Sequence, residues 1–180
     1  AAVHVAANPE FLREGTAISD VFGPDRIVIG TRSAKAAEAL ERLYAPFGAP
    51  VVLTDPKSAE LIKYASNAFL TMKISFINEI ANLCDRLGAN IDDVARGMGM
   101  DPRIGPHFLR AGIGYGGSCF PKDTRALVQL AGCVEHDFRL LKAVIEVNNR
   151  QRQVLVQKAK DYFGSLRGLR LAVLGLAFKP

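Results

Sequence analysis

The sequence predicts a mostly helical protein with α/β segments flanking the helical part. Apolar residues recur at steps of three and four from Leu61 to Leu87, which indicates one unusually long helix. Short apolar runs typical of strands precede this helix at 26–30 and 51–54, and another follows the helical part at 170–175. With 49% apolar and 23% charged residues among 180, the chain has the composition of an ordinary globular protein.

The N-terminal segment, residues 1–54, reads as strand, strand, helix, strand. Residues 1–7 alternate loosely before an Asn-Pro turn, and residues 26–30 are a β-branched run closed by glycine. Ser33 is placed to cap a helix that ends near Pro46 and Gly48, and the strand at 51–54 follows. This α/β piece is too small to form a doubly wound sheet by itself.

The helical body follows from residue 55. A single helix of roughly thirty residues, about 45 Å long, is predicted up to Gly88. A loop is expected over 98–118, and further helices over 91–97, 121–132 and 137–163. A lone hydrophobic strand cannot satisfy its own edges. We therefore expect a central helical domain with the tail of one α/β domain before it and the first strand of another, at 170–175, after it.

Composition and spacing exclude several classes of function. The 23 Lys and Arg residues are scattered among 18 Asp and Glu, so no nucleic-acid partner is expected from the net charge of +5. No apolar run is long enough to span a membrane, and no charged segment followed by an apolar one opens the chain, so neither a membrane span nor a signal peptide is expected. Three cysteines without CxxC spacing favour a reducing cytosol, and neither CxxC nor HExxH occurs to suggest a metal site.

The segment 112–123, GIGYGGSCFPKD, carries the sharpest candidate for chemistry. Its glycines let the backbone approach a ligand, and Cys119 lies near the expected start of a helix at Pro121. A helix N-terminus and the nearby Lys122 favour a thiolate, while Asp123 can hydrogen-bond a water or a substrate oxygen. The alternative is a glycine-rich turn with a structural cysteine and a capping aspartate. We expect the other two cysteines, Cys84 and Cys133, to be packing residues.

A second candidate is an amide-rich ridge on the long helix. Lys63 and Asn67 are one turn apart, on the side opposite the apolar stripe, and Thr71, Asn78 and Asn82 continue this ridge. A solvated face more often carries Glu and Lys, so the ridge suggests hydrogen bonds to an oriented group.

Charged residues in two loops are weaker candidates. Glu10 and Glu14 lie one helical turn apart after the first expected strand, and one of them could act as a base toward water. The alternative is the ordinary preference of helix N-termini for acidic residues. Arg103 and Arg110 flank the loop before Cys119 and could pair with phosphate or carboxylate, or could simply be solvated.

Four motifs in this order, NPEFLREG, KYASNAF, FLRAGIGYGGSCFPKD and GLAFKP, resemble the UDP-glucose 6-dehydrogenase family within the UDP-glucose/GDP-mannose dehydrogenases. The resemblance implies that residues 1–54 are the C-terminal part of a NAD-binding Rossmann domain. Residues 55–165 would then be a central dimerisation domain like the C-terminal domain of 6-phosphogluconate dehydrogenase. Residues 166–180 would begin a UDP-binding domain.

The resemblance also implies an activity, the NAD-dependent four-electron oxidation of UDP-glucose to UDP-glucuronate. Cys119 would capture the aldehyde as a thiohemiacetal that becomes a thioester. Lys63 and Asn67 would stabilise the developing oxyanion. Asp123 would position the hydrolytic water, and Glu14 would act as base beside the nicotinamide, with Lys122 facing the NAD.

The same resemblance assigns further residues to substrate binding. Arg103 would reach into the partner subunit's site of a cytoplasmic homodimer joined through the long helix. The residues implied to line the sugar and the pyrophosphate are Glu10, Phe11, Leu12, Arg13, Glu14, Lys63, Asn67, Phe108, Leu109, Arg110, Ala111, Gly112, Gly116 and Lys179.

Two alternatives stay open. One is a related dehydrogenase acting on GDP-mannose or a UDP-N-acetyl-hexosamine, and the other is a non-catalytic helical dimerisation module. The chain has no G-x-G-x-x-G directly after a strand and no acidic ribose ligand behind one. We therefore expect the 180 residues alone to be inactive. We also expect them to dimerise, because the apolar stripe from Leu61 to Leu87 is longer than one small domain can cover.

Overall fold

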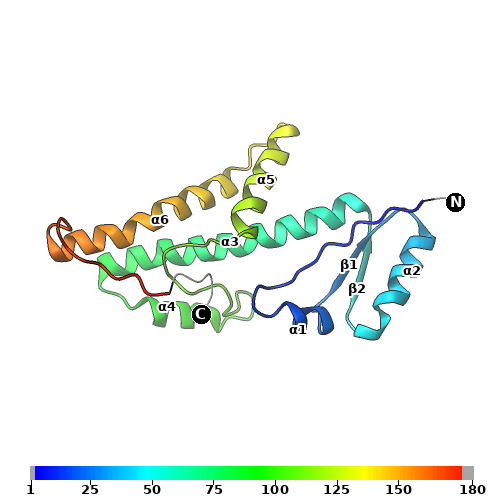
Figure 1. Ribbon diagram of the computed structural model, residues 1–180, viewed down its shortest axis with the longest axis horizontal. Coiled ribbons are helices and arrows are strands. Elements are labelled where there is room, and N and C mark those ends of the chain that lie inside the picture. The colour runs from blue at the N-terminus through cyan, green and yellow to red at the C-terminus, as the bar shows by residue number, and fades with distance from the viewer. Residues whose placement is uncertain (1–2, 176–180) are drawn as a thin grey trace. The chain divides into compact units, whose positions relative to one another are not determined.

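The computed structural model describes residues 3–175, and Figure 1 labels their helices and strands. The chain divides into two compact units, one ending at Ser66 and the other beginning at Asn67, and the division falls within the long helix. Each unit is described by itself.

Unit 1 is built on one parallel β-α-β arrangement. Its elements in chain order are α1 (Ala17–Phe22), β1 (Ile27–Gly30), α2 (Ala34–Tyr44), the short 3-10 helix η1 (Ala45–Phe47) and β2 (Val51–Thr54). Strand β1 pairs in parallel with β2, with Ile27 opposite Val51 and Gly30 opposite Thr54. The side chain of Ser33 accepts a hydrogen bond from Ala36 N and caps α2. These elements confirm both strands and the intervening helix expected from the sequence.

The core of unit 1 lies along β1. All four residues of this strand are buried, and Val28 and Ile29 are fully inaccessible. Gly30 ends the strand where no side chain fits, since a Cβ there would lie 2.4 Å from the Cβ of Ala59 and 2.8 Å from the carbonyl oxygen of Asp55. This close approach packs the first turn of the long helix against the end of the strand.

The strand expected at residues 1–7 is not observed. In its described part, residues 3–7, only Ala7 pairs with the sheet, through an isolated antiparallel bridge to Gly30. Val3 and Val5 are 88% and 76% exposed, so the alternation that suggested a strand has no buried face to stabilise it. Helix α1, in contrast, was not anticipated.

Unit 2 is helical. Its elements are the greater part of α3 (Pro56–Leu87), then α4 (Ile91–Gly99), α5 (Cys119–Cys133) and α6 (Arg139–Phe163). Helix α6 runs parallel to α3 (Figure 1), and Ser75 Oγ donates to the carbonyl of Val144 while Asn82 Nδ2 donates to Gln151 Oε1. These two contacts lie seven residues apart on each helix, so the helices keep one register over two turns. The bounds of these elements confirm the long helix and the loop before α5 that the sequence predicted.

Helix α3 buries a row of polar side chains beside Ile77 and Cys84, and it exposes large apolar ones. Thr71 and Asn78 are fully buried and Ser75 is 2% exposed, whereas Phe69, Phe76 and Leu83 are each at least half exposed. The amide-rich ridge predicted from the sequence therefore faces the other helices of its own unit. The apolar stripe faces outward. No helix among residues 3–175 is long and apolar enough to cross a membrane.

The strand expected at residues 170–175 is also not observed. These residues have no regular secondary structure, and Leu171, Val173 and Leu174 are between 63% and 91% exposed. A strand is stabilised by the backbone groups of a neighbouring strand, and within residues 3–175 this segment pairs with none.

Candidate functional site

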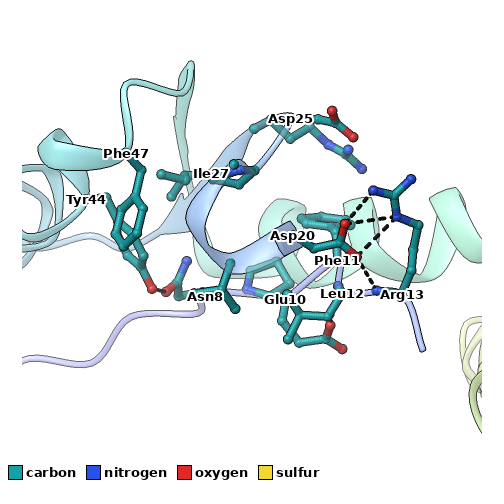
Figure 2. A pocket seen from close by; sticks show the side chains of 15 residues that line it. Asn8, Glu10, Phe11, Leu12, Arg13, Asp20, Asp25, Ile27, Tyr44 and Phe47 are labelled. Carbon is teal, nitrogen blue, oxygen red and sulfur yellow. Dashed lines mark hydrogen bonds and ion pairs between the residues drawn. The ribbon is translucent and has the colours of Figure 1, made fainter. Parts of the chain in front are cut away.

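In unit 1, the loop after Ala7 lines a surface hollow of about 190 Å³ (Figure 2). Asn8 fixes the start of this loop, because its Nδ2 donates to the carbonyl of Val28 at 2.8 Å and its Oδ1 accepts from the hydroxyl of Tyr44. The loop thus begins where the buried strand β1 and the end of α2 hold it. The hollow is smaller than the roughly 300–1,000 Å³ typical of small-molecule sites, so it accounts for only part of a nucleotide-sized ligand.

Lys63 meets this loop from the first turns of α3. Its Nζ donates to the backbone carbonyl of Glu10 at 2.6 Å and lies 2.9 Å from Glu10 Oε1, with its side chain only 18% exposed. Two cations lie near the Phe11 ring, with Arg26 Cζ 3.9 Å and Lys63 Nζ 5.4 Å from its centroid. Three residues predicted for the site, Glu10, Phe11 and Lys63, therefore lie together.

Arg13 has a partner that the sequence analysis missed. Figure 2 shows its guanidinium turned to Asp20 of α1, and the Asp20 carboxylate also accepts from Arg13 N at 2.7 Å and from Thr16 Oγ1 at 3.0 Å. These hydrogen bonds, with Arg13 as the main donor, hold the pKa of the Asp20 carboxyl well below its ordinary value. Asp20 follows Arg13 by seven residues across a turn, and this spacing is not a sequence pattern that indicates an ion pair.

In unit 2, Cys119 is the first residue of α5 and is exposed. The sequence placed the helix start near Pro121, but the helical conformation begins two residues earlier, with Ser118 as N-cap residue. Ser118 Oγ lies 3.7 Å from the Cys119 sulfur. The thiol therefore lies in the first turn, where unpaired backbone N–H groups favour negative charge.

Asp123 lies one turn beyond Cys119 and is fixed by α3. Asn67 Nδ2 donates to Asp123 Oδ2 at 2.7 Å, and the two residues are 8% and 5% exposed. Lys122 Nζ lies 3.7 Å from Asp123 Oδ1 and is itself largely exposed. Asn67 and Lys122 thus both approach Asp123, and Cys119 lies one turn before Asp123 on the same helix.

The glycine-rich loop before α5 is held by side-chain amides. Gly112 N donates to Asn78 Oδ1 at 2.8 Å, and Tyr115 N donates to Asn148 Oδ1 at 2.7 Å. The run Gly112–Gly117 has the spacing G-x-G-x-x-G, but it follows a loop rather than a strand. Because two of its N–H groups are already bonded to protein, it does not form the open phosphate cradle of a dinucleotide fingerprint.

The remaining predicted residues are more dispersed. Arg103 forms a two-pronged ion pair with Asp101, which lowers the pKa of that carboxyl, and Arg110 and Glu14 are exposed. Leu12 is exposed beside the hollow, and Lys179 lies outside the described residues. In the loop of unit 2, the predicted contact residues are Phe108 (exposed), Leu109 (buried), Ala111, Gly112 and Gly116.

Of the two cysteines expected to pack in the interior, only one does so. Cys84 is buried, but Cys133 is exposed. Leu127 and Ala131 form the buried side of α5, and a residue two positions beyond Ala131 points about 200° away around the helix. Among residues 3–175, no group of three or more His, Cys, Asp or Glu side chains could hold a metal ion.

Two segments of the chain match domains of one family. Residues 57–150 match the central domain of the UDP-glucose/GDP-mannose dehydrogenase family, and residues 1–48 match the NAD-binding domain of the same family. The chain belongs to the UDP-glucose/GDP-mannose dehydrogenase family.

Relatives within the family are similar over nearly the whole chain. The UDP-glucose 6-dehydrogenase YwqF of Bacillus subtilis is 64% identical over 99% of this chain, and the UDP-glucose 6-dehydrogenase of Rhizobium meliloti is 52% identical over 99%. These matches cover 40% and 42% of the relatives, so the chain spans about 40% of their length.

The fold agrees with that of a solved family member. The structure of a UDP-glucose dehydrogenase from the hyperthermophilic archaeon Pyrobaculum islandicum matches with a TM-score of 0.90 at 47% identity. The match covers 92% of this chain and 38% of that one. The mostly helical class predicted from the sequence, with an α/β segment before the helical part, is thereby confirmed.

Proposed function

We propose that this chain is the central part of a NAD-dependent dehydrogenase that oxidises UDP-glucose to UDP-glucuronate. The observation that carries the proposal is the arrangement at α5, with an exposed thiol at its first residue and a buried aspartate one turn on, held by Asn67. The identity of 64% to a relative named as a UDP-glucose 6-dehydrogenase supports the choice of substrate.

The chain accounts for only part of the cofactor site. Its parallel β1-α2-β2 unit is of the kind from which dinucleotide-binding sheets are built, and residues 1–48 match the family's NAD-binding domain. Within residues 3–175, no G-x-G-x-x-G run that could hold the pyrophosphate directly follows a strand. NAD, when bound, supplies the electron acceptor for both oxidations. Glu14 and Lys122 are the residues proposed to border it.

The chain's own residues perform the steps between and after the oxidations. The sulfur of Cys119 adds to the C6 aldehyde, forming the C–S bond of a thiohemiacetal whose oxygen takes a proton. Loss of a hydride from that carbon and of a proton from its hydroxyl group leaves a thioester. Water then adds to the thioester carbonyl, the C–S bond breaks, and the products are the carboxylate and the regenerated thiol.

Three further residues serve these steps. Asp123 accepts a hydrogen bond from the attacking water, and Asn67 orients this carboxylate as well as donating to the oxyanion. Lys63, which in unit 1 contacts Glu10, supplies a cation to the developing oxyanion when substrate takes the place of that contact. Glu14 receives the proton from water during thioester hydrolysis.

We also propose that the protein is a cytoplasmic homodimer that pairs through α3. Phe69, Phe76 and Leu83 are spaced by seven residues and are 58%, 50% and 50% exposed. An exposed apolar stripe with heptad spacing along one helix suits a second copy of the same helix. Arg103 is the residue proposed to reach the partner subunit's site.

The activity is tested by supplying the full-length protein that contains this chain with NAD and one nucleotide sugar at a time. We expect two NADH for each UDP-glucose consumed, and much slower turnover of GDP-mannose and UDP-N-acetyl-hexosamines. Release of a free aldehyde with one NADH per sugar would contradict the thioester route. Preferential turnover of GDP-mannose would contradict the substrate assignment.

A further inference from the structure

Three side chains from α3 and α6 hold the backbone of the glycine-rich loop in unit 2. We call Asn78, Asn148 and Gln151 the amide latch. All three are buried, at 0%, 3% and 6% exposure. Burying polar amides costs free energy unless they form hydrogen bonds. Each of the three side chains bonds to the backbone of this loop; Gln151 also accepts from Asn82 of α3, and Asn78 Nδ2 has no partner among the described residues.

Asn148 binds one residue of the loop from both sides of its amide. Its Oδ1 accepts from Tyr115 N at 2.7 Å, and its Nδ2 donates to Tyr115 O at 3.1 Å. This is the pairing that a neighbouring strand would otherwise provide. The Asn148 side chain thus fixes both the position and the orientation of the peptide units on either side of Tyr115.

Asn78 and Gln151 hold Gly112 in the same way. Gly112 N donates to Asn78 Oδ1 at 2.8 Å, and Gly112 O accepts from Gln151 Nε2 at 2.9 Å. Gln151 is in turn bound by Asn82 Nδ2 at 2.9 Å. The loop is therefore fastened at two points, three residues apart, by both of the long parallel helices.

Packing connects the Asn148 end of the latch to Cys119. The Tyr115 side chain is buried, and its ring lies 6.1 Å from that of Phe120 in an edge-to-face arrangement at 85°. Phe120 directly follows Cys119 in the first turn of α5. A shift of Tyr115 therefore moves the turn that carries the thiol.

The glycine-rich loop leaves room for the Asn148 side chain. Gly114 has φ of 101°, and a Cβ at this position would lie 2.5 Å from Asn148 Oδ1. A glycine is needed here for two reasons, its backbone conformation and its close contact with the latch.

We propose that Asn148 is a positioning residue for the thiol chemistry at Cys119, and that Gln151 and Asn78 position the sugar-binding part of the loop at Gly112. This inference rests on the proposed function. It assigns distinct kinetic effects to two ends of one buried amide cluster, because Tyr115 packs toward Cys119 whereas Gly112 belongs to the expected substrate contacts.

The test compares Asn148→Ala with Asn149→Ala in the full-length protein. Asn149 is the next residue of α6 and is exposed, so it matches the residue type without the latch contacts. We expect Asn148→Ala to lower kcat about ten- to a hundredfold, the range for a small misplacement of reacting groups, with little change in KM. Gln151→Ala should mainly raise KM, and Asn149→Ala should match the wild type. A residue that only stabilises the fold would not separate kcat from KM in this way.

A second variant reaches the latch from the loop. Gly114→Ala introduces the clash with Asn148, so it should also lower kcat, and it should cost less in an Asn148→Ala background than in the wild type. Additive losses in the double variant would overturn the contact between them as the cause.

Hydrogen exchange provides a readout that does not depend on activity. Asn148→Ala should speed exchange at the Tyr115 amide while leaving the α4 amides unchanged. Unchanged exchange at Tyr115, or equal kcat in the wild type and Asn148→Ala, overturns the proposal. A wild type that forms no NADH from any nucleotide sugar overturns the proposed function and the kinetic role with it, while the exchange result still decides whether Asn148 holds the loop.

Discussion

Asn67 of α3 donates a hydrogen bond of 2.7 Å to the carboxylate of Asp123 in α5, and both side chains are buried. This contact joins the long helix to the helix that carries Cys119. A buried acceptor that loses its donor retains the cost of desolvation without compensation. The pair therefore links the stability of unit 2 to the geometry around the thiol.

Asn67→Ala should lower the free energy of unfolding by about 1–3 kcal/mol, because Asp123 Oδ2 is left buried without its donor. Urea denaturation of the wild type, the two single variants and the double variant with Asp123→Ala measures this. In the Asp123→Ala background, the loss of Asn67 should cost clearly less. Equal costs in both backgrounds would show that the two residues act independently.

Cys119 should react with iodoacetamide faster than Cys133 at mildly acidic pH, and Cys84 should not react in the folded protein. Cys119 and Cys133 are both exposed, whereas Cys84 is buried, so access does not distinguish the first two. The thiolate is the reactive species, and a helix N-terminus stabilises negative charge while a C-terminus does not. Mass spectrometry of the three cysteine peptides over time gives the rates. Equal rates at Cys119 and Cys133 would remove the case for an activated thiol.

Lys63→Ala should reduce kcat of the full-length protein about a hundred- to a thousandfold, the loss expected for an oxyanion donor. Steady-state kinetics should show a much smaller change in KM, since such a donor acts mainly in the transition state. Lys57→Ala, an exposed lysine in the first turn of the same helix, is the matched control. An unchanged kcat with a raised KM would instead make Lys63 a residue for substrate binding alone.

The contribution of the Arg13–Asp20 pair to the free energy of unfolding should depend on pH. Hydrogen bonds from Arg13 lower the pKa of Asp20 from its ordinary value of 3.8. The carboxylate therefore stabilises the native state fully above pH 3.8, and this contribution is lost as the pH falls toward the lowered pKa. Wild type should exceed Asp20→Asn in free energy of unfolding at pH 7, and the difference should shrink below pH 3.8. Asp25→Asn, at the same hollow, is the control, and a difference that stays constant to pH 2 would contradict the assignment.

The 180-residue chain should sediment as a dimer and should form no NADH from UDP-glucose and NAD. Phe76→Glu should convert it to a monomer, because pairing through the exposed heptad stripe would bury the new carboxylate of both copies. Glu79→Gln on the same helix should leave the dimer intact. Analytical ultracentrifugation at micromolar concentration distinguishes these states. A wild-type monomer would contradict the proposed pairing through α3.

The sequence predicted helices better than it predicted their partners. The spacing of apolar residues located α3 correctly, but the periodicity alone does not say whether the stripe or the opposite ridge is buried. Asn78 and Asn82 were recognised as unusual for a solvated face, and they are bonded to the chain's own loop and to α6. Asn148 and Gln151 were missed because they meet the loop only through packing of helices far apart in sequence.

Local spacing was sufficient at Cys119 and insufficient at the strands. The sequence placed Cys119 beside the start of a helix and Asp123 in its first turn, and the common face of the two residues follows from the observed start of α5 at Cys119. Residues 3–7 and 170–175 have the apolar character of strands, but a strand also needs backbone partners. Between residues 3 and 175, the structure offers the first segment one bridge and the second none.

The most direct test of the proposed function is to trap the thioester on Cys119. In a full-length Asp123→Asn variant, hydrolysis should be slowed, so acid quenching after mixing with NAD and UDP-glucose should leave the sugar attached. Mass spectrometry should then find the Cys119 peptide heavier by the UDP-glucuronyl group, and hydroxylamine should remove that group. Continued formation of UDP-glucuronate with Cys119 unmodified, or by a Cys119→Ser variant at the wild-type rate, would contradict the assignment of Cys119 as the nucleophile.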